Sequence, residues 1–278
     1  ALVLLVGSGL LMQTILRLQS VPPGFQPDGA LAMDLSLDSK KYPPGDRRSV
    51  FVRRILRHLE SLPGIEAAGA ATTLPMSGST DSSVRAVNRP DLDEFAISTD
   101  YDFISGSFLR ALGIPLLRGR DFTQQDDTSQ APRVAMISKA LAQKIFPKEN
   151  PLGQQVRLWN ETWQIVGIVG DVRQRGPERN VKEHIYLPEV FNPYSLSLVV
   201  RTKVSPLTTV ELIRKEILKL DPDQPVANVR TLKRIVAGFT ERREWILILL
   251  GFFAGAAMLL AAIGLYGMMA YTVSRRTR

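Results

Sequence analysis

No cysteine occurs among the 278 residues of the chain, and histidine occurs only twice, at His58 and His184. The absence of cysteine excludes a disulfide-linked scaffold, thiolate zinc sites, iron–sulfur clusters and a cysteine nucleophile. Neither histidine has carboxylates nearby at metal-ligand spacing, which argues against a histidine metal site. We interpret His58, which lies among arginines, as part of a solvated helix face, and His184 as the residue before a strand.

Motifs for nucleotide binding and hydrolysis are missing as well. The sequence has no G-x-x-x-x-G-K-[ST] phosphate loop and no G-x-S-x-G elbow, although a Ser–His–Asp triad assembled from distant residues stays open. The stretch Gly167–Asp171 lacks the G-x-G-x-x-G spacing, so we interpret it as a buried strand that runs into a turn. Asp126–Asp127 and Asp91–Glu94 lack the pattern of a calcium loop and are interpreted as solvated loop acids. We predict no catalytic, cofactor-binding or metal-binding residue.

Charge is absent from both ends of the chain. Residues 1–16 and 245–274 carry no charged side chain, whereas all 27 acidic residues lie between Asp28 and Glu244. Half of the net charge of +8 comes from four arginines beside these apolar runs, namely Arg17, Arg275, Arg276 and Arg278. Basic residues at such positions usually mark a membrane boundary. The rest of the chain lacks a basic stripe interleaved with aromatics, so we expect no nucleic-acid binding.

The run at residues 245–273 predicts a transmembrane helix, since about 20 apolar residues cross a hydrocarbon core. Trp245 stands at one end and tyrosines stand near the other, as interfacial aromatics do. The alternative, a buried helix of a soluble protein, rarely has so long an uncharged run. Small residues let membrane helices approach closely, although glycine in an apolar helix can also be incidental. The predicted packing residues are Gly251, Gly255, Gly264 and Gly267.

Residues 1–19 are predicted to be a truncated transmembrane helix, because they lack the positive start and cleavage pattern of a signal peptide. The basic segment 274–278 is expected to begin a cytoplasmic region. Two crossings then place residues 20–244 in the periplasm or outside the cell. We therefore predict a multi-pass protein of the plasma (inner) membrane.

The outer region contains two strand–helix–strand patterns. In the first, alternating apolar residues predict a strand at 31–37, Asp46 is expected to cap a helix, and residues 65–73 predict a second strand. The second pattern has a strand at 196–201, a helix starting at Ser205–Pro206 and a strand at 226–230. Two such units predict a ferredoxin-like α+β domain made of residues 25–104 and 192–243.

Residues 105–191 are predicted to be an inserted mixed α/β subdomain. We expect a helix at 105–112 that Gly113 stops, a strand at 134–137, and a helix capped by Ser138. Residues 155–158 and 163–169 predict a hairpin.

Six stretches of the sequence follow one another along the chain: Phe108–Ile114, Leu117–Phe122, Asn150–Gly153, Ile165–Asp171, Ile185–Pro188 and Ala262–Arg278. In this order they resemble the periplasmic core domain of MacB-like (FtsX-like) ABC transporter permeases. Their residues are most similar to those of the duplicated permeases of soil acidobacteria.

This resemblance implies a Porter-like ferredoxin-type subdomain with a Sabre-like insertion, both outside the membrane. It also implies a permease subunit of an ABC-type export or mechanotransmission system that is not itself an enzyme. The implied partners are an ABC ATPase subunit, a second copy or a paired permease repeat, membrane lipid and a periplasmic adaptor. Two alternatives stay open: the ligand-sensing domain of a receptor or sensor kinase, and a membrane-anchored structural domain.

The last part of the chain predicts one continuous helix. Thr231 can cap its start, and no proline follows through Arg278. Such a helix would extend outside the bilayer as a stalk that couples the outer domain to the membrane. We assign this coupling stalk to Ala237, Gly238, Glu241, Arg242 and Arg243.

Overall fold

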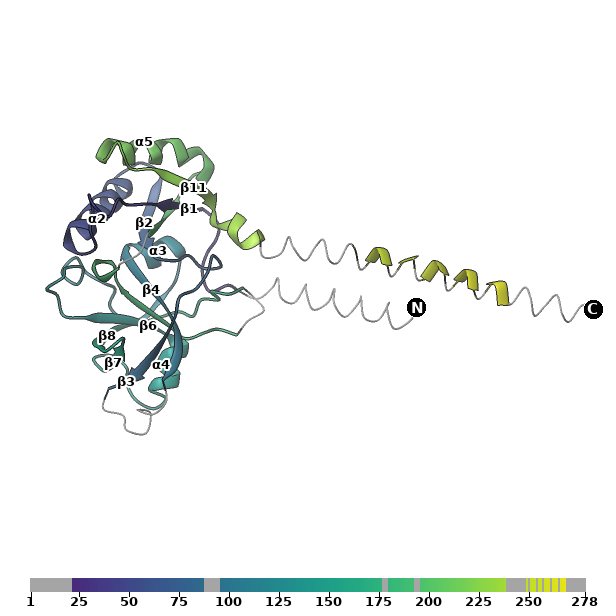
Figure 1. Cartoon of the computed structure of the whole chain (residues 1–278), viewed down its shortest axis with the longest axis horizontal. Helices are drawn as coiled ribbons and strands as arrows, with labels where there is room; N and C mark the ends of the chain where they lie inside the picture. Colours follow the sequence, from purple (N-terminus) through teal and green to yellow (C-terminus); the bar gives the residue numbers. More distant parts are fainter. Residues whose placement is uncertain are drawn as a thin grey trace, which may run out of the picture. The chain divides into compact units, whose positions relative to one another are not determined.

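The structure is a computed structural model that describes residues 22–87, 96–176, 180–192 and 196–238, together with parts of 249–268. Its contacts divide the chain into two compact units. Residues 23–236 form the first, which we call the outer unit, and residues 1–22 and 237–278 form the second. Figure 1 shows the strands and helices of the outer unit.

One half of the outer unit is a four-stranded antiparallel sheet in the order β11-β1-β10-β2. Each pair of parallel strands encloses an antiparallel neighbour and is joined by a helix, which is the ferredoxin-like arrangement. The elements are β1 (Ala30–Leu35), α2 (Asp46–Glu60), β2 (Ile65–Ala71), β10 (Leu196–Thr202), α5 (Val210–Leu220) and β11 (Val226–Thr231). The prediction of a ferredoxin-like α+β fold is confirmed.

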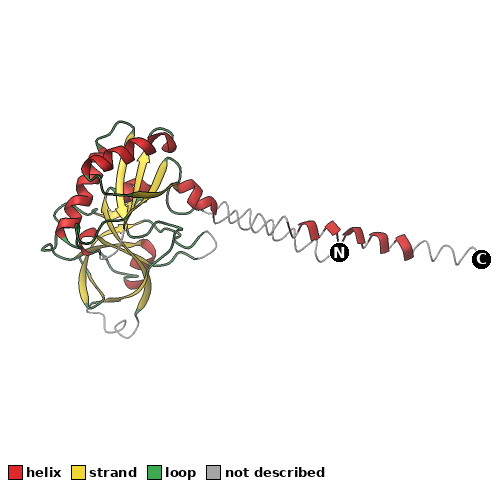
Figure 2. Cartoon of the chain, turned by 45° about the horizontal axis from the view of Figure 1, so that its top comes forward, coloured by secondary structure: helices red, strands yellow, loops and turns green. Residues whose placement is uncertain are grey.

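Helices α2 and α5 cover one face of this sheet, as Figure 2 shows for the two long helices beside the strands. Leu31, Met33 and Leu35 alternate along β1 and are buried beneath them. The opposite face is lined by small residues of β2 and packs against α3 (Phe108–Leu112). Gly69 permits this approach, because a Cβ there would overlap the backbone of Phe108.

The inserted half is built around a ring of strands. Pairings run from β4 through β3, β7, β8, β6 and β9 and return to β4, so these described strands close into a barrel. Tyr101 and Phe103 point into its core, and α4 (Lys139–Ile145) packs Leu141 against the same core. The strands are β3 (Asp81–Ala86), β4 (Ile97–Gly106), β6 (Val134–Ser138), β7 (Gln155–Leu158), β8 (Glu161–Val169) and β9 (His184–Pro188).

Strand β4 belongs to both halves. Its residues 104–106 pair with β2 of the ferredoxin-like sheet, and residues 100–104 pair with β9 of the barrel. Neither β3 nor β4 was predicted from the sequence. The predicted boundary between the ferredoxin-like part, which ends at residue 104, and the insertion, which begins at residue 105, stays a prediction. The continuous strand β4 crosses this position.

Several local predictions are confirmed. Ser138 caps α4 by accepting a 3.2 Å hydrogen bond from the Leu141 backbone N–H, and β7 and β8 form the predicted hairpin. Gly167 lies in β8, as interpreted from the sequence, but the turn after this strand comes only at residues 174–175, beyond Asp171. Thr231 accepts a hydrogen bond from the Arg234 backbone N–H, and residues 232–238 are helical.

Two predicted helix starts are wrong. The N-cap of α2 is Gly45, because the Asp46 carboxylate is turned to the backbone N–H and hydroxyl of Ser129. The helix expected at 105–112 begins only at Phe108, since the preceding residues finish β4. Ser205 and Pro206 do start a helical segment, but its first turn is a 3-10 turn, η2 (Pro206–Thr209), and the α-helix α5 begins only at Val210.

In the second unit, the described residues include one helix, Gly251–Met268, that is long and apolar enough to cross a membrane, with a mean hydropathy of 1.7. It lies within the predicted transmembrane segment 245–273. The other predicted membrane segment, residues 1–19, lies outside the described residues.

Candidate functional site

The two halves of the outer unit meet at the carboxylate of Asp127, which is 5% exposed. Ser49 of α2 donates a 2.8 Å hydrogen bond to Oδ2, and Arg53 lies 3.0 Å from the same oxygen. On the other side, Oδ1 accepts a 2.8 Å hydrogen bond from the backbone N–H of Val190, in the turn η1 (Glu189–Phe191). Ser105 of β4 donates at 3.3 Å. Asp127 thus joins α2, β4 and η1.

A second carboxylate, Glu189, is buried next to Asp127. It is 1% exposed, and Arg48 Nε lies 3.5 Å from Oε1, which is too far for a hydrogen bond. Burial, followed by the negative charge of Asp127, raises the pKa of Glu189 to about 8. Glu189 is therefore mostly protonated at neutral pH.

The loop that carries Asp127 is itself held by an ion pair. Arg120 contacts both oxygens of Asp126, at 2.6 and 2.9 Å, and Thr123 donates from its backbone N–H and its hydroxyl. Burial alone would raise the pKa of Asp126, but Arg120 and Thr123 hold it below its ordinary value. These contacts correct the prediction that Asp126 and Asp127 are solvated. Asp91–Glu94 lie outside the described residues.

Glycines shape the chain before the loop that carries Asp126 and Asp127. Gly113 ends α3 in the left-handed conformation, with φ of 67°. Gly119 of β5 (Leu116–Gly119) has φ of 81°, and a Cβ there would overlap the carbonyl oxygen of Val166. At Gly167 a Cβ would lie 2.6 Å from the Arg120 carbonyl oxygen. Two glycines of the quoted family stretches, Gly119 and Gly167, thus let β5 and β8 approach closely, whereas Gly113 ends α3.

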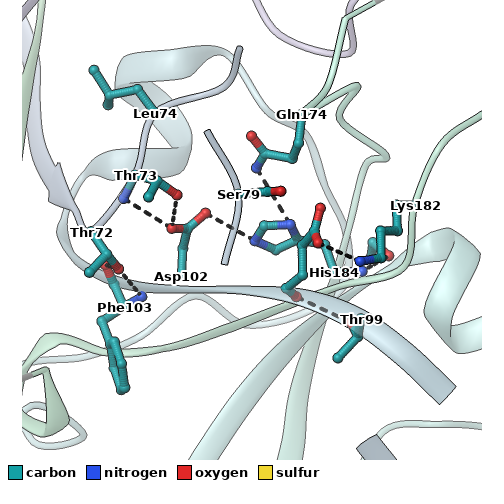
Figure 3. A network of polar contacts seen from close by, with 12 residues as sticks. Thr72, Thr73, Leu74, Ser79, Thr99, Asp102, Phe103, Gln174, Lys182 and His184 are labelled. Carbon is teal, nitrogen blue, oxygen red and sulfur yellow. Dashed lines mark hydrogen bonds and ion pairs between the residues drawn. The ribbon is translucent and has the colours of Figure 1, made fainter. Parts of the chain in front are cut away.

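A network of buried polar side chains lies on the outer face of the barrel (Figure 3). Asp102 Oδ1 accepts hydrogen bonds from the backbone N–H and hydroxyl of Thr73. Its Oδ2 lies 3.2 Å from Nε2 of His184, and Nδ1 of His184 lies 3.4 Å from Gln174. With both ring nitrogens facing protein groups and only 2% exposure, His184 has no access to a substrate. The network ties the loop after β2 to β4 and β9.

Asp100 extends this network to the surface. Its Oδ1 lies 3.0 Å from Arg175 and 2.8 Å from Lys182, and both cations also contact Asp81. Burial raises the pKa of Asp100. The pKa of Asp81 is lowered to about 2, because its carboxylate shares a hydrogen bond with Asp100 and contacts Lys182. Within the described ranges, no group of three or more acidic, histidine or cysteine side chains could hold a metal ion.

The interpretation of His58 as part of a solvated helix face holds only in part, because its side chain is 35% exposed and is also paired. Its Nε2 lies 2.8 Å from Glu216 Oε2, so His58 joins α2 to α5. This contact depends on the packing of two helices that are far apart in the sequence, and the arginines around His58 gave no sign of it.

The structure describes only part of the predicted coupling stalk. Ala237 and Gly238 are helical, whereas Glu241, Arg242 and Arg243 lie outside the described residues. At the start of this helix, Leu232 and Ile235 are 0% and 9% exposed and pack in the core with Phe25. The helix therefore begins inside the outer unit.

The four predicted packing glycines are all helical and exposed in the described part of the second unit. A Cβ added at any of them would meet nothing within 4 Å in this chain. Their surfaces are free to contact another helix.

Comparison with known proteins identifies the fold and the family. The family model of the MacB-like periplasmic core domain matches residues 8–220. The macrolide export ATP-binding/permease protein MacB of Marinobacter nauticus is 28% identical over 177 residues, which cover 59% of this chain and 27% of that protein. The uncharacterized ABC transporter permease YknZ of Bacillus subtilis is 24% identical over 251 residues, covering 85% of this chain and 58% of that protein.

A solved structure supports the same fold. The periplasmic region of MacB from Actinobacillus actinomycetemcomitans superimposes with a TM-score of 0.52 at 14% identity, covering 81% of this chain and 98% of that one. This chain thus spans between about a quarter and three fifths of the length of the two permeases named above. The family resemblance inferred from the ordered stretches is confirmed. The chain belongs to the family of MacB-like periplasmic core domains.

Proposed function

We propose that this chain forms part of the permease subunit of an ABC-type export or mechanotransmission system, whose outer unit moves together with the following membrane helix. The supporting observation is the burial of Leu232 and Ile235 in the core of the outer unit. A helix that is anchored in a core passes on a displacement that a flexible linker would absorb. The matched relatives are named as permeases, which favours this function over a sensor.

The length of the chain is sufficient for such a stalk. A continuous helix from Thr231 to Val273 would extend about 65 Å at 1.5 Å per residue. A bilayer core takes up about 30 Å. Several helical turns, including Glu241, Arg242 and Arg243, would then stand outside the membrane.

ATP hydrolysis, in this proposal, belongs to a separate or linked ABC ATPase subunit, since the chain has no phosphate loop. A second copy or a paired permease repeat, membrane lipid and a periplasmic adaptor complete the proposed partners. Residues 20–244 would lie outside the cytoplasm of a multi-pass inner-membrane protein.

Proline at Ala237 tests the coupling. Proline removes a helical hydrogen bond and its ring clashes with the preceding turn, so Ala237→Pro should kink the stalk. A dye on Ser83→Cys, an exposed position of β3, reports movement of the outer unit. In the full-length permease assembled with its ATPase, we expect Ala237→Pro to keep ATP hydrolysis and lose the ATP-dependent change in dye fluorescence.

The matched control is Gly238→Ala, because alanine favours a helix by about 1 kcal/mol over glycine. This variant should keep the fluorescence change. An assembled Ala237→Pro variant with a wild-type response would show that the stalk only tethers the outer unit.

The orientation has its own test. Cysteines at Ser83 and Ser274 can be treated with a membrane-impermeant reagent in intact spheroplasts. We expect labelling at residue 83 and protection at residue 274; the reverse pattern would contradict the proposed topology.

A further inference from the structure

One face of α2 carries positive charge without any compensating acid. Arg47, Arg54 and Arg57 are exposed, and no ion pair joins any of them to another described residue. Their spacing places them on one side of the helix together with Val50, which is 52% exposed. We call this surface, made of Arg47, Val50, Arg54 and Arg57, the α2 face.

The acids of α2 do not neutralise this surface, because both are used elsewhere. The Asp46 carboxylate accepts hydrogen bonds from Ser129. Glu60 accepts from the Ala68 backbone N–H at 3.1 Å and lies 3.2 Å from Arg110. Arginines three residues apart on a helix repel one another, so the α2 face destabilises the free helix slightly.

A hollow adjoins the α2 face at Arg57. It has a volume of about 250 Å³ and lies between α2, the end of β4 and the loop at residues 121–124. Leu56, Ile104 and Phe122 give it apolar walls, and exposed Gln124 lines it as well. Three carboxylates also line it, each beside an arginine: Glu60 pairs with Arg110, Asp127 with Arg53, and Asp121 lies near Arg120. A hollow of this kind suits a single large apolar side chain, the usual anchor of a protein interface.

We propose that the α2 face and this hollow form a docking surface for another protein, through a segment that carries carboxylates on both sides of one apolar side chain. Carboxylates would pair with the arginines, and the apolar side chain would enter the hollow. This inference goes beyond the proposed function, because it holds whether or not the stalk transmits motion.

A second copy of the chain fits less well. A symmetric contact with a second copy would bring like charges together, since a two-fold interface pairs a surface with itself. A lipid surface is the other occupant that arginines could attract, and the vesicle measurement below tests it.

The probe is a fluorescein-labelled peptide in which a single phenylalanine stands between two runs of four glutamates. The comparison peptide has alanine in place of the phenylalanine. Binding to the full chain in a neutral detergent is measured by fluorescence anisotropy at low and physiological salt. We expect the phenylalanine peptide to bind about tenfold more tightly than the alanine peptide. Binding should weaken with salt, as exposed charge pairs do.

Variants then locate the site. Removing Arg47, Arg54 and Arg57 together as glutamines should weaken binding about tenfold or more. The matched control removes the same charge at three exposed positions elsewhere, as Lys148→Gln, Arg157→Gln and Lys215→Gln, and should bind like wild type. Circular dichroism confirms that both triple variants are folded.

Gln124→Trp fills the hollow. This variant should keep the salt-dependent binding and lose the preference for phenylalanine over alanine. Equal loss of binding in the two triple variants, or no difference between the peptides for wild type, would overturn the proposal. So would failure to bind either peptide alongside binding of phosphatidylglycerol vesicles that depends on the same arginines, because the occupant would then be a lipid surface.

Discussion

The Ser49 hydroxyl donates a 2.8 Å hydrogen bond to the carboxylate of Asp127, which lies 78 residues later in the chain. This contact joins a helix of the ferredoxin-like half to the loop that leads into the barrel. The same carboxylate accepts from the Val190 backbone N–H and balances Arg53. The relative position of the two halves therefore depends strongly on one buried acid.

Asp127→Ala should destabilise the outer unit by about 3 kcal/mol, because it leaves a half-buried arginine and a backbone N–H without their partner. Urea unfolding of the full chain in detergent, followed by tryptophan fluorescence, measures the loss. Asp127→Asn should recover only part of it, since an amide oxygen can accept from Val190 but carries no charge.

The control for Asp127 is Glu211→Gln, which removes an acid from a surface pair with Arg214 on α5. Exposed ion pairs contribute less than about 1 kcal/mol, so this change should be nearly silent. Equal unfolding free energies for Asp127→Ala and Glu211→Gln would show that Asp127 does not hold the halves together.

Glu189 should make the outer unit less stable as the pH rises. Burial and Asp127 raise its pKa to about 8, whereas the unfolded chain releases this proton near 4.5. Between these two values the folded state holds one proton more, so stability falls with rising pH. Its contribution is fully present below pH 4.5 and is lost by the time the pH has risen through 8.

Glu189→Gln removes this titration and keeps the size of the side chain. The difference in melting temperature between the variant and wild type should shift in favour of the variant from pH 5 to pH 8.5. Comparing the variant with wild type at each pH cancels the pH dependence that the other acids give to the melting temperature, because the substitution leaves their pKa values largely unchanged. A difference that does not vary with pH would mean that Glu189 is ionised in the folded protein.

Gly119 and Gly153 allow two effects of replacing glycine to be measured separately: strain of the backbone at positive φ, and overlap of the new Cβ with a neighbouring strand. Both have positive φ, 81° and 83°, but only Gly119 faces a carbonyl oxygen where a Cβ would lie. Gly153→Ala should therefore cost about 1 kcal/mol for its backbone conformation. Gly119→Ala should cost clearly more, because β5 must move away from β8. Unfolding free energies that match within error would show that β5 moves without cost.

Sequence pattern predicted the parts of the fold that depend on local chemistry. Alternation of apolar residues identified β1, and a serine before an apolar helix identified the cap at Ser138. Sequence pattern also identified the two strand–helix–strand units of the ferredoxin-like half, because both units show the same periodicities of apolar residues.

The features that local pattern missed depend on distant contacts. Strand β4 has Asp100 and Asp102 in its middle, and these acids fit a strand only because Lys182 and His184 of later segments neutralise or contact them. Asp127 follows another aspartate in a loop, and nothing nearby distinguishes it from a solvated acid. The family stretches contain Gly119 and Gly167, but only the structure shows that these glycines let β5 and β8 approach closely.

The last prediction concerns helix packing in the membrane. At about 100° per residue, Gly251 and Gly255 share a face, whereas Gly264 lies on roughly the opposite side of the helix from Gly255. Small residues four apart let backbones approach, so we expect Gly251 and Gly255 to form the closer contact with another helix.

Replacing both Gly251 and Gly255 by leucine should weaken self-association of the full chain in detergent, measured by energy transfer between labelled copies. Since a Cβ meets nothing in the single chain at these positions, the melting temperature of the outer unit should stay unchanged. Gly264→Leu is the matched control on the opposite side and should have a smaller effect. If Gly264→Leu alone abolished association while the double variant did not, the contact would lie on the other face. If neither change had any effect, the glycines would be incidental to packing, because leucine at a close helix contact forces the backbones apart.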